Sequence, residues 1–205
     1  DSSTSGLATV VASRCTGVLI KNLSLTNGKY GVYFEGVNSS VITSCKIYGN
    51  HTTGIYIENF FSSPKVYLSD GNVISNNIIS ANGSYNIRLI ESTNSQIIYN
   101  EVKNLSSDSG VYGIYMNACS NTKVRYNNVS SNGFVGIRVS GHTTYIVNSV
   151  VYDFLSTGNI LEDNVIKSHT RGIQFGLVND ISVIRNIIQN NGYGIWALDT
   201  NIIQQ

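Results

Sequence analysis

The sequence predicts an all-β parallel solenoid, in which the short strands of successive coils stack on one another. Three observations favour this fold class. Two strand-like motifs recur in a fixed order, and no window carries apolar residues at helical spacing over three turns. Pro64 is the only proline, so glycine and asparagine must form the turns. A unit of two or three very short strands cannot bury its apolar face alone, whereas stacked copies bury a continuous core.

The first motif begins with a small residue and continues as Ile or Val, a variable residue and an apolar residue. Consecutive copies begin 22 to 36 residues apart. In an alternating strand the first and third residues after the small one point inward and the second points outward. The copies are Gly31–Phe34, Gly54–Ile57, Asn86–Leu89, Gly113–Met116, Gly136–Val139, Gly172–Phe175 and Gly194–Ala197.

The second motif carries two aliphatic residues five positions apart and precedes each copy of the first. A recurring asparagine within it predicts a ladder of stacked side chains that holds the bend between strands. Asn-Gly pairs favour hairpins in isolation, but the unchanged order of the motifs predicts solenoid corners instead. We also expect His51 and His169 to pack at equivalent corners. The predicted ladder is Asn76, Asn100, Asn127 and Asn186, with Asp163 and Cys45 in the same position.

We expect residues 1–205 to form one parallel β-helix domain that is part of a longer chain. The two longest intervals between motifs predict inserted loops near residues 60–71 and 142–157. Loops of this kind are the segments most suited to wall a groove.

The pattern aliphatic-x-x-Asn, Asn-Gly and Gly-Ile-x-aliphatic resembles the right-handed parallel β-helix repeat family, including its carbohydrate-binding and sugar-hydrolase domains. It is also similar to the β-helix accessory proteins of nitrous-oxide reductase maturation. The resemblance covers Val10 to Leu198 and implies a single-stranded right-handed parallel β-helix of about seven to eight coils. The Asp-Pro-His-Glu signature of the mannuronan epimerases is absent, and the Gly-His-Gly segment of the polygalacturonases is reduced to Gly141-His142-Thr143.

The outward residue of each first motif predicts one strip along the solenoid. Aromatic and arginine side chains stack on sugar rings and hydrogen-bond to sugar hydroxyls or carboxylates, so the strip is the candidate ligand-binding surface. Alternatively, exposed tyrosines simply pack on their neighbours across coils. The strip residues are Tyr33, Tyr56, Arg88, Tyr115, Arg138, Gln174 and Trp196.

Two residues further along, Glu35 and Glu58 fall at equivalent positions of adjacent coils. Such a pair can share a proton, bind a cation or act as acid and base, and with Arg88 and Arg138 it supplies the candidate catalytic residues. Glu91 joins the pair if its strand end is displaced by one residue. Alternatively, the glutamates are solvated side chains at strand ends. No third ligand supports a metal, and no cofactor is predicted.

The amino-acid composition limits which classes of binding partner are plausible. With 41% hydrophobic residues, 12% charged residues and a net charge of +1, the chain can bury a core but has no basic surface for nucleic acid. No apolar run is long enough to span a bilayer. Solvation by amides and hydroxyls in place of charges favours an extracellular or cell-surface location.

Neither the cysteines nor the sequons fix the cellular compartment. Cys15, Cys45 and Cys119 are expected to stay unpaired, because coil spacing separates them by more than the roughly 6 Å of a disulfide. The number of Asn-x-Ser/Thr sequons agrees with chance in a chain so rich in Asn and Ser. These candidate N-glycosylation sites are Asn22, Asn38, Asn50, Asn82, Asn104 and Asn128.

We interpret the chain as an extracellular β-helix domain that binds a polysaccharide or another extended ligand along the strip without catalysis. Two alternatives stay open. One is a structural subunit or spacer of a surface layer, filament, adhesin or viral tail, which self-associates through open solenoid ends. The other is a polysaccharide lyase, epimerase or hydrolase. The residues do not name the ligand.

Overall fold

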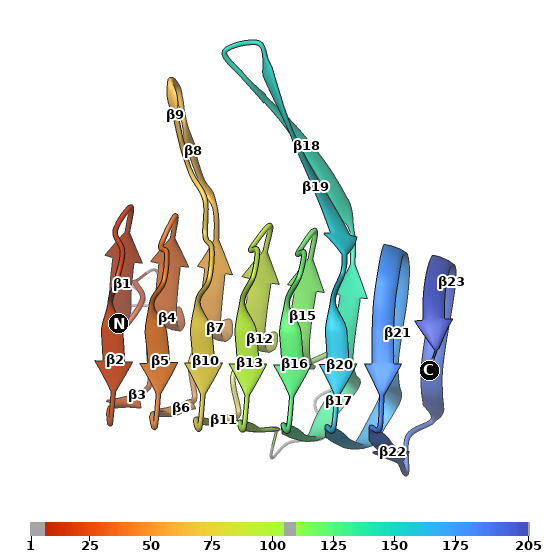
Figure 1. Ribbon diagram of the computed structural model, residues 1–205. Coiled ribbons are helices and arrows are strands. Elements are labelled where there is room, and N and C mark those ends of the chain that lie inside the picture. Colours follow the sequence, from red (N-terminus) through yellow and green to blue (C-terminus); the bar gives the residue numbers. More distant parts are fainter. Residues whose placement is uncertain (1–6, 105–109, 205) are drawn as a thin grey trace.

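The computed structural model describes residues 7–104 and 110–204, with side chains through Leu198. In these ranges all regular structure is strand, and 21 strands form one continuous hydrogen-bonded system. Figure 1 shows the coils stacked side by side from the N-terminal to the C-terminal end of a column. The prediction of an all-β parallel solenoid is confirmed.

Each coil contributes one short strand to each of three faces, and each strand pairs in parallel with its equivalents in the neighbouring coils. Face 1 comes first in every coil. Each coil adds one strand to this face, and that strand pairs in parallel with the face 1 strands of the coils before and after it. Its strands are β2 (Leu19–Lys21), β5 (Val41–Thr43), β10 (Val73–Ser75), β13 (Gln96–Ile98), β16 (Lys123–Arg125), β20 (Ile160–Glu162), and the ends of β21 (Val165–Ile184) and β23 (Tyr193–Gln204).

Faces 2 and 3 complete the coil. Face 2 consists of β3 (Ser24–Leu25), β6 (Lys46–Tyr48), β11 (Ile78–Ser80), β14 (Glu101–Lys103), the starts of β17 (Asn128–Ser140) and β21, and β22 (Ile187–Gln189). Face 3, which carries the longest strands, consists of β1 (Val10–Ser13), β4 (Tyr30–Glu35), β7 (Thr53–Glu58), β12 (Tyr85–Ile90), β15 (Tyr112–Asn117), the end of β17, the middle of β21 and the start of β23.

The core is a set of aliphatic columns inside the three faces. Faces 1 and 2 each give one inward side chain per coil, and face 3 gives two. Ile42, Ile74 and Ile97 of face 1 stack in register and are at most 1% exposed. A side chain of this size contributes about 1.5–3 kcal/mol when it is fully buried. The repeated aliphatic positions therefore stabilise the column coil by coil.

A ladder of asparagines forms the corner between faces 1 and 2. The Oδ1 atom of each accepts a hydrogen bond from the backbone N–H of the equivalent residue in the preceding coil, at 2.9 or 3.0 Å. The residue before each ladder position has a positive φ, which bends the chain into the ladder. The ladder runs Cys45, Asn77, Asn100, Asn127, Asn164 and Asn186.

Two predicted ladder positions were wrong by one residue. Asn77 and Asn164 occupy the ladder, whereas Asn76 and Asp163 form the left-handed bend before it, with φ of 55° and 54°. The error arose because consecutive aliphatic residues, such as Val73 and Ile74, do not show which of the two points inward. Ile74 is the buried one.

A second ladder forms the corner between faces 2 and 3 and includes one histidine. The backbone N–H of Asn132 donates to Nδ1 of His169, and the backbone N–H of His169 donates to Oδ1 of Asn191. His169 therefore packs in the corner as expected. His51 is not its equivalent, because His51 is exposed and follows the ladder residue Asn50.

Protonation of His169 is incompatible with this ladder, because Nδ1 already accepts the Asn132 N–H and Nε2 lies 3.2 Å from the Val129 carbonyl oxygen. Burial lowers the pKa of His169 from 6.5 to about 4. Between these values the unfolded chain binds more protons, so stability falls as the pH drops through this window, by about 3 kcal/mol in all. We expect His169→Asn to remove this part of the acid sensitivity. Urea unfolding at about pH 7 and about pH 4.5 measures it; an equal loss in both proteins would contradict the assignment.

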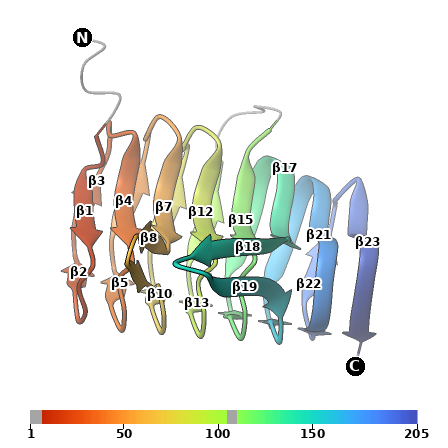
Figure 2. The same ribbon diagram turned by 90° about the horizontal axis from the view of Figure 1, so that it is seen from above.

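The two long intervals each form an antiparallel hairpin at the corner between faces 3 and 1. β8 (Phe60–Ser62) pairs with β9 (Lys65–Tyr67), and β18 (His142–Val147) pairs with β19 (Val150–Thr157). Both hairpins project from the column in Figure 1, and Figure 2 shows β18–β19 lying across the coils towards β8–β9.

Candidate functional site on face 3

The predicted strip is a single column on face 3. Strand pairing joins Tyr33 to Tyr56 and Tyr115 to Arg138 in directly adjacent coils. The same register continues without a break to the last described coil. In order the column reads Tyr33, Tyr56, Arg88, Tyr115, Arg138, Gln174 and Trp196.

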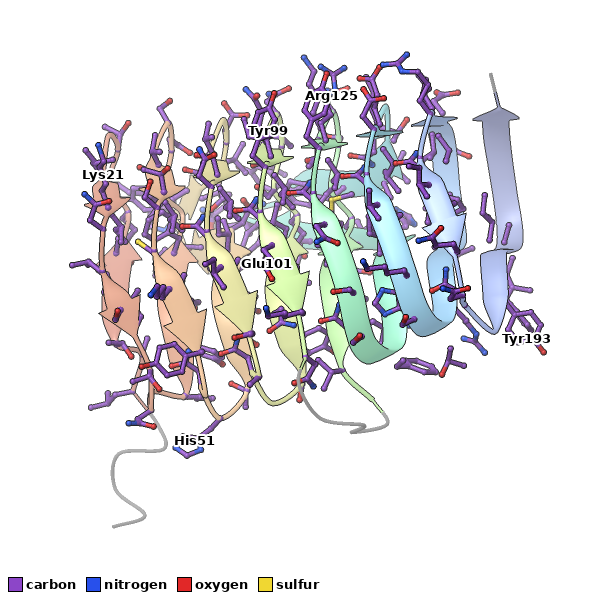
Figure 3. All side chains as sticks on the ribbon, turned by 90° about the horizontal axis from the view of Figure 1, so that it is seen from below. Lys21, His51, Tyr99, Glu101, Arg125 and Tyr193 are labelled. Carbon is purple, nitrogen blue, oxygen red and sulfur yellow. The ribbon has the colours of Figure 1, made fainter. Side chains whose placement is uncertain are left out.

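A second aromatic column lies beside the strip and was missed by the sequence reasoning. Its residues begin the strands of face 3, immediately before the small residue of the motif. The small residue is missing from the strand pairing between coils, so the pairing is irregular at this point. Strict alternation along the strand therefore does not predict which way the preceding residue points. The recurring Tyr before Gly or Asn was the available signal. Thr53 and Val135 hold this position in two coils and are buried. We call the other members the flanking column: Tyr30, Tyr85, Tyr112, Arg171 and Tyr193. Figure 3 labels Tyr193 at its end.

The two columns pack on each other, and arginines lie between aromatic rings. The Arg88 guanidinium lies 4.6 Å from the ring centre of Tyr56 and 5.0 Å from that of Tyr85. Arg138 lies over Tyr112 and Tyr115, both on β15 of the preceding coil. Each such cation–π contact contributes about 0.5–2 kcal/mol. The expectation that all strip residues are exposed was wrong for Tyr56 and Gln174, which are 7% exposed because neighbouring side chains cover them.

Glu35 and Glu58 are neighbours, as predicted, but tyrosines surround them. The Tyr33 hydroxyl donates to Glu58 at 2.6 Å and lies 3.2 Å from Glu35, and the Tyr56 hydroxyl also donates to Glu58. Burial, followed by the Glu58 carboxylate, raises the pKa of both tyrosines. The tyrosines therefore act as hydrogen-bond donors and not as bases.

Arg88 of the predicted catalytic set lies in the coil next to that of Glu58, and Arg138 lies two coils beyond Arg88. Within the described ranges, no ion pair within 4 Å joins Glu35 or Glu58 to Arg88 or Arg138. The carboxylates lie at the N-terminal end of face 3, and Arg138 lies several coils further on. Charge on this face is thus segregated along the column.

An open groove lies beside the C-terminal half of the strip. Its volume is about 360 Å³, and Arg138 and Tyr115 form one wall. Arg138 donates to the Tyr112 hydroxyl at 3.1 Å and has no carboxylate partner among the described residues. The groove therefore presents a positive charge beside a half-buried ring. The lining residues are Tyr115, Asn117, Arg138, Ser140, Gly141, Gly176, Leu177 and Leu198.

Half of the candidate glycosylation sites cannot accept a glycan in this fold. Asn50, Asn82 and Asn104 are buried, being at most 5% exposed. The Asn50 and Asn82 amides belong to the second corner ladder, where a glycan would break the hydrogen bonds of the column. Asn22 and Asn128 are exposed and Asn38 is half-buried, so these three stay candidates.

The remaining sequence predictions concern the cysteines, a metal site and membrane-spanning segments. Cys15, Cys45 and Cys119 are free thiols, as expected. Among the described side chains, which extend through Leu198, no three His, Cys, Asp or Glu residues lie close enough to share a metal ion. None of the described residues belongs to a helix that could cross a bilayer.

The family assignment follows from the fold and a sequence comparison. A family model described as "right handed beta helix region" matches residues 3–151. This is more than half of the chain, and the parallel stacking of three faces agrees with it. The chain belongs to the right-handed β-helix family. No curated protein sequence matches it significantly.

Solved structures share the fold at low sequence identity. The A-module of the mannuronan C-5 epimerase AlgE6 from Azotobacter vinelandii superposes with a TM-score of 0.78 at 17% identity, over 97% of this chain and 53% of that one. A double mutant of the periplasmic alginate epimerase AlgG superposes with a TM-score of 0.71 at 20% identity, over 91% of this chain and 39% of that one. XylC in complex with xylose superposes with a TM-score of 0.58 at 13% identity, over 87% of this chain and 34% of that one. This chain thus spans between about a third and about half of those proteins.

Proposed function

We propose that the chain is a non-catalytic, extracytoplasmic module that binds an acidic polysaccharide along face 3, with the groove beside Arg138 as its main contact. The observation that carries the proposal is the open groove next to an arginine that is held on aromatic rings and has no carboxylate partner. A guanidinium fixed in this way is prepared to donate paired hydrogen bonds to a sugar carboxylate.

The geometry of the strip suits a polymer. Arg88 and Arg138 lie two coils apart in one column, which is about 10 Å at the strand spacing and comparable to the length of a disaccharide. Two structures with this fold are epimerases of alginate or mannuronan, both polyuronates, and one of them is periplasmic. These likenesses support the ligand class and the compartment.

Non-catalytic binding fits the glutamates better than acid–base chemistry does. Glu58 accepts hydrogen bonds from two tyrosines whose pKa values are raised, so its oxygens are already used within the protein. Removal of the proton alpha to a uronate carboxylate needs a base beside the arginine that binds that carboxylate. Among the described residues that line the groove, Arg138 is the only charged side chain, and none is a carboxylate or a histidine.

Calorimetry with oligomannuronate, oligogalacturonate and neutral xylo-oligosaccharides tests the proposal. We expect binding of the acidic oligomers only, and we expect Arg138→Ala to weaken it about 10-fold to 100-fold, since a charge-assisted hydrogen bond is worth about 1.5–3 kcal/mol. Arg185→Ala is the matched control, because it removes the same charge from the corner between faces 1 and 2.

The control should bind within about two-fold of the unsubstituted protein. No binding of any oligomer, or equal weakening by both substitutions, would overturn the proposal. End-to-end association without glycan binding would favour the alternative role as a structural spacer.

A further inference from the structure

The two hairpins meet above the column although they arise from different coils. Phe61 of β8–β9 stacks on Tyr145 of β18–β19, with ring centres 4.1 Å apart and an angle of 21° between the planes. Nearer the tips, Ser63 Oγ donates to Asn148 Oδ1 at 2.9 Å. Figure 2 shows the resulting bridge passing over the coils of β12 and β15.

Glu91 lies beneath this bridge at the end of β12. It is 3% exposed, one carboxyl oxygen has no hydrogen-bond partner among the described residues, and the Tyr145 hydroxyl is near enough to lower the pKa of the carboxyl group. The equivalent corner position holds Arg14, Gly36, Ala118 or Gly141 in other coils, as their matching backbone hydrogen bonds show. The fold therefore does not require an acidic residue here, and a glutamate at φ 55° adopts a conformation that glycine adopts at less cost.

The titratable groups that act on Glu91 come from three elements. They are Glu58 at the end of β7, the Cys119 thiol after β15, and Tyr145 on the hairpin. Burial and then Glu58 raise the pKa of Glu91, and the Tyr145 hydrogen bond opposes them. Burial raises the pKa of Cys119 and of Tyr145 to about 12, so both stay neutral while carboxyl groups titrate.

The hairpin β18–β19 is held at its root by the pairing of β19 with β21 and further out by its contacts with β8–β9. Its outer face is open, with Ile146 at 73% and Val151 at 62% exposure, and an isolated two-stranded hairpin is marginally stable in water. Its root is Gly141, with φ 98°, where the Ser156 hydroxyl donates to the Ser140 carbonyl. Gly141 and Ser140 also line the groove beside Arg138. The root of the hairpin therefore adjoins the groove.

We propose that hairpin β18–β19 is a latch that closes on protonated Glu91 and opens when Glu91 ionises, so that pH sets access to face 3. Closure over an ionised Glu91 would bury a charge beside Glu58, whereas opening solvates that charge. Closure is therefore favoured below the ordinary glutamate pKa of 4.5 and is lost as the pH rises through the higher value of the closed state. Only the link to ligand access rests on the proposed function.

Hydrogen exchange of the backbone amides of residues 142–157 tests the latch without any ligand. Exchange is expressed as protection relative to the intrinsic rate at each pH, from about pH 4 to about pH 8, and amides of β15 report global folding. We expect protection of the hairpin to fall as the pH rises from about 4 to about 8, while protection of the β15 amides stays unchanged.

Three variants separate the latch from other causes. Glu91→Gln, which mimics the protonated carboxyl, should keep the hairpin protected at every pH. Glu58→Gln should retain the transition and move it to lower pH, because it removes the like charge. Phe61→Ala should leave the hairpin unprotected at every pH. A pH-independent hairpin in the unsubstituted protein, or the same transition in Glu91→Gln, would overturn the proposal whatever the glycan experiments show.

Discussion

Replacing Asn127 with alanine is expected to lower the free energy of unfolding by about 3–5 kcal/mol, because it leaves several buried polar groups without partners. Asn127 Oδ1 accepts from both the backbone N–H and the Nδ2 of Asn100, at 2.9 and 3.0 Å. Its Nδ2 lies within 3.0 Å of the carbonyl oxygens of Ile97 and Arg125. The side chain is 1% exposed, so water cannot replace these bonds without entering the column.

Asn128→Ala is the matched control for this prediction. Asn128 is the next residue in the chain and its side chain is exposed, so its loss should change stability by no more than about 0.5 kcal/mol. Urea unfolding followed by circular dichroism measures both variants. A cost below about 1 kcal/mol for Asn127→Ala, or equal costs for the two, would show that the ladder does not hold the corner.

The fold was predictable because one local pattern repeats in every coil. Each inward aliphatic residue stacks on its own equivalent, so finding the repeat also gave the pairing partners of Tyr33 and Arg138. The ladder was predicted less well, because its position depends on which of two adjacent aliphatic residues points inward. Asn76 and Asp163 were misplaced by one residue for this reason.

The candidate site was predictable only in part, because exposure depends on contacts between coils. The alternation of face 3 gave the strip, but it did not show that Arg88 lies between Tyr56 and Tyr85 and helps to cover them. The hairpins were located by the lengthened intervals. Their meeting through Phe61 and Tyr145 depends on the angle at which each leaves the column, which no local pattern encodes.

Replacing Gly136 with alanine is expected to destabilise the protein by about 3 kcal/mol, because the added carbon has no space. A Cβ atom there would lie 2.6 Å from the Gly172 carbonyl oxygen, 2.7 Å from Ile166 Cγ2 and 2.8 Å from a carbon of the His169 ring. Gly176→Ala is the control, since nothing lies within 4 Å of its Cβ position and its stability should change by no more than about 0.5 kcal/mol.

The same crowding explains why the motif begins with glycine in most coils. At Gly31, Gly54 and Gly113 a Cβ would also come within 2.7 Å of the carbonyl oxygen of the next coil. Asn86 occupies this position only because its side chain enters the corner ladder, accepting from Asn82 at 2.8 Å and donating to Asn132 at 2.6 Å. The side chain is tolerated where it replaces a ladder amide. If urea unfolding gave Gly136→Ala and Gly176→Ala equal stability, close approach of the coils would not be the reason for glycine, and backbone flexibility in the unfolded chain would have to be considered instead.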